Sequence, residues 1–292
     1  MRLLAKFSLI FTLVFGAGLA GACYVSNWFL QQIAREQVIQ QARLMMETMR
    51  SARNYTVKQI VPLLQTEQAR DRVFLPQTVP AFAATETFNY LRARYPDYEY
   101  KEATLNPTNL RDRAVDWETD IINQFRNHTE KTELVGERDA ATGRSLFLAR
   151  PIKADLPCLE CHDQPSGAPA SMIRRYGAAN GFGWKEGEIV GSQIMSVPMA
   201  VPLRMADKTF QALATYLGAA FLLILVVLDV VLVITITRPA SRLSSMADRI
   251  SLGDFDVPEL PVKGKDEISV LAGSFNRMRR SFEKAMNMLE GK

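Results

Sequence analysis

Two long apolar blocks constrain the fold of this chain more than any other feature of its sequence. The first runs from Phe7 to Leu30 and the second from Leu213 to Ile236, in a chain of 292 residues. Each block exceeds the roughly 20 residues that a helix needs to cross the hydrocarbon core of a bilayer. The segment between them is polar and charged, so the pattern predicts two transmembrane helices and a folded domain outside the membrane.

Basic residues beside the two blocks predict the orientation. Arg2 and Lys6 precede the first block, and Arg238 and Arg242 follow the second. Because lysine and arginine mark the cytoplasmic side, residues 31–212 are expected in the periplasm, with the chain anchored twice in a bacterial inner membrane. The first block is too long for a typical signal peptide, which favours an uncleaved anchor. The net charge of +4 arises from interleaved basic and acidic residues, so no nucleic-acid partner is expected.

The sequence that follows the first block predicts a long helix. No helix breaker occurs from Ser26 until Pro62. Apolar or small residues recur at alternating steps of four and three, which is a helical seam: Val38, Ala42, Met45, Met49, Ala52 and Thr56. From residue 70 to residue 212, helical patches alternate with strand-like runs and Pro/Gly turns. We therefore expect the fold class α+β, with a small antiparallel sheet that carries helices on one side.

Two short heptad seams follow the second block. The first consists of Pro239, Leu243, Met246 and Ile250, and the second of Ile268, Leu271, Phe275, Met278 and Phe282. Two such helices, joined by an extended connector directly behind a transmembrane helix, resemble a HAMP signal-transfer module. The resemblance includes Pro239 at the membrane exit, "GDF" at 253–255 and "DEI" at 266–268. It implies a parallel dimer in which two chains form a four-helix bundle; a generic coiled-coil tail is the alternative.

The stretch "CLECH" at 158–162 carries the strongest chemical signal. It holds two of the three cysteines and one of the two histidines of the chain. A structural zinc site needs four ligands, and the other candidates, Cys23 in the first apolar block and His128, do not complete one. A thioredoxin-like dithiol needs a βαβ pattern, which is not visible. C-x-x-C-H is the attachment signature of c-type haem, which predicts one haem c, bound covalently by Cys158 and Cys161, with His162 as the proximal iron ligand.

Longer stretches resemble a known family. "FLPQTVPAFAATETFNYLRARYPDYEYKEATLNPTNLRDRAVDWE", "ARPIKADLPCLECH" and "GFGWKEGEIVGSQIMSVPM" are similar to the periplasmic c-type-haem, PAS-like sensor domain, the cyanobacterial Tll-type haem domain formerly catalogued as a domain of unknown function. The resemblance implies a PAS-like sheet, with the haem between that core and the long N-terminal helix. It also implies a second axial ligand from the helix, but the cysteine that fills this role in the cyanobacterial member has no counterpart here.

The second axial ligand is therefore predicted from the residues of the long helix. Methionine is a common partner of histidine in c-type cytochromes, and Met49 is our preferred distal ligand. The alternatives are Met45, Met46, His128, the weaker Met195 and an open sixth position that would bind a gas. The competing interpretation is that these methionines only fill the core. Arg53 and Tyr55 are candidate contacts of the haem propionates, although both residues also suit ordinary structural roles.

These features predict a membrane-bound haem sensor rather than an enzyme. The predicted organisation is a first transmembrane helix at 1–30, a periplasmic c-haem domain at 31–212, a second transmembrane helix at 213–236 and a cytoplasmic HAMP module at 237–292. Redox change or binding of a gas such as NO or CO would be the input, and a homodimer and a separate cytoplasmic output protein are the expected partners. The alternative is a membrane-anchored electron-transfer cytochrome with a periplasmic redox partner. Asp229, in the second span, is costly in lipid and is expected to contact a second chain or, less simply, to relay protons.

Overall fold

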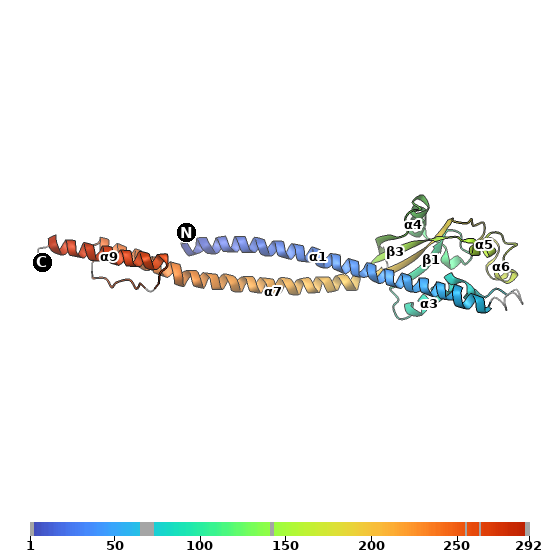
Figure 1. The fold of residues 1–292 in the computed structure, drawn as a ribbon, viewed down its shortest axis with the longest axis horizontal. Coiled ribbons are helices and arrows are strands. Elements are labelled where there is room, and N and C mark those ends of the chain that lie inside the picture. Colours follow the sequence, from blue (N-terminus) through green and yellow to red (C-terminus); the bar gives the residue numbers. More distant parts are fainter. Residues whose placement is uncertain (1–2, 65–72, 141–142, 255, 263, 290–292) are drawn as a thin grey trace. The chain divides into compact units, whose positions relative to one another are not determined.

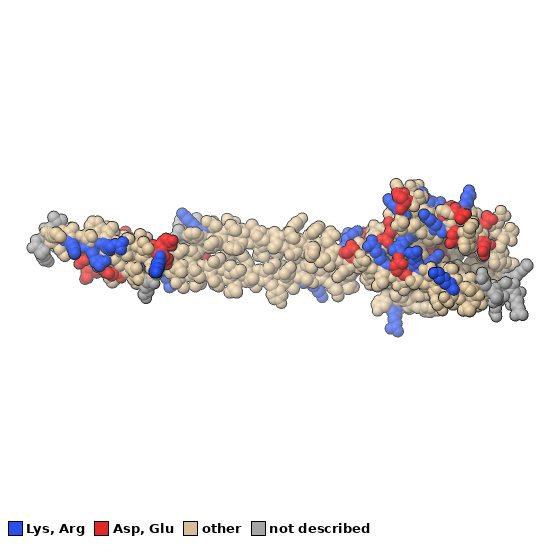
Figure 2. Space-filling view, in the orientation of Figure 1, with Lys and Arg blue, Asp and Glu red and all other residues tan. Residues whose placement is uncertain are grey.

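The computed structural model describes residues 3–64, 73–140, 143–254, 256–262 and 264–289. Its longest elements are the helices α1 (Leu3–Tyr55) and α7 (Ala200–Leu232). Both carry segments long and apolar enough to cross a membrane. Figure 2 shows that the surfaces of these apolar segments are almost free of charged side chains, which gather instead on the domain between the segments and on the C-terminal region. The two apolar blocks of the sequence thus form candidate membrane spans, as predicted. Arg2 lies outside the described residues.

The chain divides into two compact units, one of which consists of residues 28–208. A four-stranded sheet with the strand order β1-β4-β3-β2 forms its centre, and every neighbouring pair is antiparallel (Figure 1). The strands are β1 (Glu99–Thr104), β2 (Leu134–Ala140), β3 (Gly143–Lys153) and β4 (Ile189–Pro198). The apolar runs at 144–152 and 188–201 predicted β3 and β4, whereas β1 and β2 are too polar to be recognised from periodicity.

Helices cover both faces of this sheet. The part of α1 that follows the first candidate span packs on one face together with helix α3 (Pro80–Arg92). The buried residues of this core are Val38, Ile39, Ala42, Met46, Met49, Ala84, Phe88, Tyr100, Leu146, Leu148, Met195, Val197 and Met199. Helix α4 (Asp116–Asn127) packs on the opposite face, against Ala103, Ala149 and Ile194. The expectation of helices on one side was therefore wrong. β3 and β4 are central strands, so alternate side chains point to opposite faces and both faces need a cover.

Shorter helices complete the unit. They are the 3-10 turns Pro76–Thr78 and Leu110–Asp112, α5 (Leu156–His162) and α6 (Ala170–Tyr176). β4 is followed almost at once by α7, with only Met199 between them. Met199 is buried, and its backbone N–H donates to the carbonyl of Arg144 over 3.0 Å. The end of the sheet is thus joined to α7 without a flexible linker.

The other unit consists of residues 1–27 and 209–292. In it, the Ser8 hydroxyl donates a hydrogen bond of 2.6 Å to Asp229 Oδ1. Asp229, whose carboxylate is costly in lipid, therefore has a hydrogen-bond partner in the first candidate span of the same chain. The sequence had suggested a partner in a second chain.

The C-terminal helices are α8 (Arg238–Ser251) and α9 (Glu267–Leu289). Leu243 of α8, Ala272 of α9 and Leu260 of the connector form a small core, and Met246 and Phe275 pack against it. Asn276 fixes the connector, because its side chain accepts from the Leu260 N–H at 3.0 Å and donates to the Leu260 carbonyl at 2.9 Å. The predicted helix–connector–helix arrangement is confirmed. Leu271, Met278 and Phe282 of the second seam are exposed.

Two π-helical turns interrupt the long helices at equivalent places. The first is Thr56–Ile60 and the second is Val233–Thr237. Each ends two residues before a proline, Pro62 or Pro239. A proline ring clashes with the carbonyl four residues earlier in an α-helix, and this carbonyl lies inside the π-helical turn in both cases. The wider i→i+5 pairing thus lets each helix continue past its proline.

Candidate functional site

Helix α5 presents both cysteines of the CLECH motif on one face. Cys158 and Cys161 are three residues apart, which places their side chains one above the other. Both thiols are free and partly buried. The Cys158 thiol donates to Asp155 Oδ1 over 2.7 Å, and burial together with this bond raises its pKa. Burial and the charge of Glu160 raise the pKa of Cys161. The site therefore holds two neutral thiols, aligned on one turn of helix.

His162 is held at the end of α5 in a defined orientation. Its Nδ1 lies 2.6 Å from the carbonyl oxygen of Gly181, and because a carbonyl only accepts, Nδ1 carries the proton. The Trp184 ring stacks on the imidazole, with the ring centroids 4.0 Å apart and an interplanar angle of 10°. Burial lowers the pKa of His162, which favours the neutral ring. Its Nε2 is thereby left with a free lone pair, which is what a metal-ligating histidine requires.

The loop around Gly181 creates this arrangement. Gly181 has φ +85°, and a Cβ at this position would lie 2.8 Å from the backbone of Thr108. Its N–H donates to Asn106 Oδ1 over 3.1 Å, and the Thr108 hydroxyl lies 3.4 Å from His162 Nδ1. Sequence reasoning missed Gly181, Asn106 and Thr108 as parts of the site. The Gly-x-Gly run was a signal for a tight loop, but nothing in the sequence said that the loop closes on the histidine.

A buried polar network lies on the α1 side of the same site. Arg53 forms an ion pair with Glu102, which is 4% exposed. Tyr100 donates to Glu102 over 2.7 Å, and Gln193 donates to Tyr100 over 3.3 Å. Burial opposes the charge of Arg53, but the charge and hydrogen bond of Glu102 outweigh it and raise the pKa of Arg53, with a further contribution from Cys158. Arg53 of α1 therefore lies within electrostatic range of Cys158 on α5.

The other predicted site residues are dispersed. Met49 and Met46 are buried in the core on the α1 face of the sheet, where Met195 also lies, and Met45 packs against that core. Tyr55 is 60% exposed. His128 is exposed at the end of α4, 3.5 Å from Glu130. The choice of distal ligand stays a prediction.

The donor set of α5 fits a covalently attached haem. Two thiols on one helical face and a neutral imidazole with a free Nε2 are the groups that such an attachment uses. Cys158, Cys161 and His162 would hold the group. The haem would supply an iron that can change oxidation state and exchange an axial ligand.

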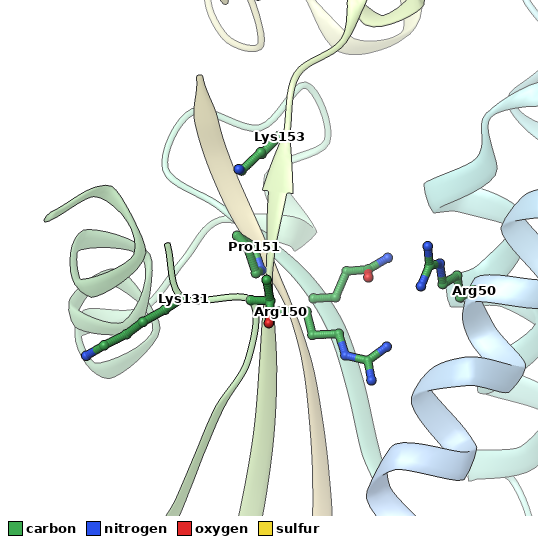
Figure 3. Close-up of a pocket in the computed structure, with 7 residues that line it drawn as sticks. Arg50, Lys131, Arg150, Pro151 and Lys153 are labelled. Carbon is green, nitrogen blue, oxygen red and sulfur yellow. The ribbon is translucent and has the colours of Figure 1, made fainter. Parts of the chain in front are cut away.

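A hollow of about 290 Å³ lies between α1 and the sheet. Figure 3 shows Arg50 extending into it from α1 and Arg150 reaching toward α1 from β3, whereas Lys131 and Lys153 extend the other way. The remaining lining residues are Thr132, Pro151 and Gln193. Gln193 belongs to the polar network described above, so the hollow adjoins the α1 side of the site.

Comparison with known proteins gives two family matches. The Tll0287-like model matches residues 31–198, more than half of the chain, and the HAMP domain model matches residues 231–284. No curated protein matches. Among solved structures, the crystal structure of the cyanobacterial haem protein Tll0287 matches with 15% identity and a TM-score of 0.43, covering 55% of this chain and 94% of that one. Both resemblances seen in the sequence motifs are thus confirmed.

Proposed function

The chain belongs to the Tll0287-like family and carries a HAMP domain, and from this premise we propose that it is a membrane-bound c-type haem sensor. Its input would be a change in haem redox state or the binding of a gas such as NO or CO. Its output would be a change in the packing of the HAMP helices. It would act as a homodimer and not as an enzyme.

The observation that carries the proposal is the geometry of the CLECH helix. Cys158 and Cys161 share one face of α5, and His162 is oriented by the Gly181 carbonyl and by the Trp184 ring. A hydrogen bond to the second ring nitrogen fixes the tautomer and raises the basicity of a ligating histidine. The chain thus provides both the tether and a prepared proximal ligand for one haem c.

Two connections support signalling rather than attachment alone. Arg53 of α1 is paired with Glu102 of the sheet and lies within electrostatic range of Cys158, and α1 continues into the first candidate span. β4 runs through the buried Met199 into α7, which forms the second. A change at the site could bias both helices, and a HAMP bundle with two packings of similar energy would report the bias.

The finer assignments belong to the same proposal. Residues 31–212 would form a PAS-like domain in the periplasm of a two-pass inner-membrane protein. Basic residues support this orientation, because they lie at the ends of the two spans that face away from the domain and mark the cytoplasmic side. Met49 is proposed as the distal ligand because it is the last methionine on α1 before Arg53. Met45, Met46 and His128 are its alternatives.

Absorption spectra of the chain, expressed with a c-haem maturation system, test the proposal. We expect a covalent haem band that Cys158→Ser with Cys161→Ser removes. In the haem-loaded wild type, reduction of the iron or addition of NO or CO should change the axial ligation of the haem. Met49→Leu conserves volume, so it should leave the fold intact and remove the spectral signature of a methionine ligand; Met46→Leu is the matched control. A wild-type chain without covalent haem would overturn the sensor assignment.

An electron-transfer cytochrome is the second candidate function. The exposed position of much of α5, including Leu156 at 63%, favours it, since electron exchange needs an accessible cofactor edge. It leaves the HAMP domain without a role. A haem that keeps both axial ligands in both oxidation states, ignores NO and CO, and exchanges electrons rapidly would favour the carrier.

A further inference from the structure

The hollow between α1 and β3 is lined by two guanidinium groups that approach from opposite sides. Arg50 projects from α1, and Arg150 projects from β3 (Figure 3). Both groups are cationic, and a nearby anion reduces their mutual repulsion, as Glu47 and Glu133 do for Arg150. The polar side chains of Gln193 and Thr132 also line the hollow. Its lining is therefore rich in hydrogen-bond donors.

The ion pairs around the hollow leave Arg50 without a carboxylate. Arg150 pairs with Glu47 and, at 3.0 Å, with Glu133. Arg43 also pairs with Glu133, at 3.0 Å. None of the ion pairs among the described residues includes Arg50, although its charge contributes to the low pKa of Glu47. Three arginines thus face two carboxylates, and the unmatched one lines the hollow.

The place of the hollow in the sheet links it to the haem-attaching helix. Gln193 is opposite Glu102 on one side and opposite Arg150 on the other, so these residues form a polar row across three strands. Arg53, one helical turn beyond Arg50, pairs with Glu102 at one end of this row and lies within electrostatic range of Cys158. The row therefore runs from the neighbourhood of the cysteines to the hollow.

These contacts also change the expected partner of the haem carboxylates. Arg53 was a candidate for a propionate contact, but its guanidinium is already paired with the buried Glu102. Tyr55, the other candidate, is largely exposed. Arg50 is exposed as well, but it lines an actual hollow and has no acidic partner. An arginine fork suits a carboxylate because it can donate two parallel hydrogen bonds.

We propose that Arg50 and Arg150, together with Gln193, form a binding site for carboxylate or phosphate oxygens. The two sources of such a group are the propionates of the haem and a free anion from the surrounding solution. The first source rests on the proposed haem function, and the second does not. In either case, Arg50 supplies the unpaired charge and Arg150 the opposite wall.

The first experiment uses the chain with Cys158→Ser and Cys161→Ser, which cannot attach haem. Its thermal unfolding midpoint is measured in nanodiscs with sodium phosphate, sodium succinate or sodium chloride at equal ionic strength. We expect phosphate or succinate to raise the midpoint by a few degrees above chloride. Arg50→Gln should abolish this increase, and Arg50→Lys should retain part of it. Arg94→Gln, which removes an exposed cation outside the hollow, is the matched control and should keep the whole increase.

The second experiment uses the haem-loaded chain and identifies the source. If propionates occupy the site, phosphate and succinate will no longer stabilise the protein. Arg50→Gln will then lower the haem midpoint potential, because a positive charge near the haem favours the reduced iron, and Arg94→Gln will not. If a free anion occupies it, the haem-loaded chain will still be stabilised and its potential will not respond to Arg50→Gln.

The proposal is overturned if the haem-free chain shows no anion-specific stabilisation and Arg50→Gln behaves like Arg94→Gln in the haem-loaded chain. Near-ultraviolet circular dichroism confirms that each variant is folded. A wild-type chain that lacks covalent haem would refute the proposed function, while the first experiment would still decide whether the anion site exists.

Discussion

His162 directs its Nδ1–H at the carbonyl oxygen of Gly181, which is 2.6 Å away in space and 19 positions later in the chain. This contact leaves Nε2 as the coordinating atom of the imidazole. It depends on Gly181 adopting φ +85° against the backbone of Thr108. The orientation of the proximal ligand is therefore set by a residue that has no side chain.

Gly181→Ala tests this dependence. The added methyl group would collide with Thr108 and would occupy a left-handed conformation, so we expect the free energy of unfolding to fall by about 3 kcal/mol. We also expect a changed haem spectrum. Gly187 has a similar φ, +76°, but open space around it. Gly187→Ala should therefore cost only about 1 kcal/mol and leave the spectrum unchanged. Equal effects of the two variants in thermal unfolding would contradict the steric argument.

Asp112 should make the stability of the domain depend on pH. Burial is the main cause that raises its pKa from 3.8 to about 6. The folded protein thus binds this proton more tightly than the unfolded chain does, so the free energy of unfolding falls as pH rises from about 4 to 6 and stays lower above that range. Asp112→Asn should be more stable than the wild type by about 1–2 kcal/mol at pH 7, with the difference vanishing near pH 4. Thermal unfolding across this range checks it, and a constant difference would refute it.

The sequence was informative where chemistry or strong periodicity repeats locally. The two spans, the long helix, β3, β4 and both HAMP helices follow from apolar patterns that packing does not override. The CLECH motif was equally informative, because both thiols and the imidazole lie within five adjacent residues. By contrast, β1 (Glu99–Thr104) places Glu102 in the interior. Its burial depends on Arg53 and Tyr100, and no local pattern predicts such a partner.

The hydrogen bond between Ser8 and Asp229 should hold the two spans together. Ser8→Ala removes the hydroxyl that donates the 2.6 Å hydrogen bond to Asp229. The Asp229 carboxylate is then left without this donor in an apolar environment. We expect a loss of about 1 kcal/mol, a typical value for interhelical hydrogen bonds in membranes. Titration with sodium dodecyl sulfate in mixed micelles measures it. Ser8→Thr keeps the hydroxyl and should resemble the wild type, whereas a Ser8→Ala chain as stable as the wild type would mean that the contact contributes nothing.

Asn276 should keep the connector between α8 and α9 closed. Its side chain is 4% exposed and makes two hydrogen bonds to Leu260. Asn276→Ala leaves both backbone groups unsatisfied, at a cost of about 1–3 kcal/mol. Limited proteolysis should then cleave the connector about 5 to 150 times faster, if cleavage follows the open population. Asn287→Ala changes an exposed asparagine of the same helix and serves as the control; equal cleavage of the two variants would argue against the clamp.

The distal side of the site was the part least accessible to sequence reasoning. Met45, Met46 and Met49 share one helical stretch, and the same spacing suits a ligand and a core side chain. The structure buries Met46 and Met49 together with Met195, and a buried position suits either role. The roles of Gly181, Arg50 and Gln193 could not be predicted either, because each acquires its role from a residue that is distant in the chain.

The π-helical turn Val233–Thr237 joins the second span to α8 just before Pro239. In such a turn each N–H pairs with the carbonyl five residues back instead of four, so the helix is locally unwound. If one residue of the turn regains α-helical pairing, all side chains beyond it rotate about the helix axis. The apolar seam at Leu243 and Ile250 would then face a new direction. The direction of the seam relative to the second candidate span would therefore depend on the hydrogen-bond pairing in the turn before Pro239.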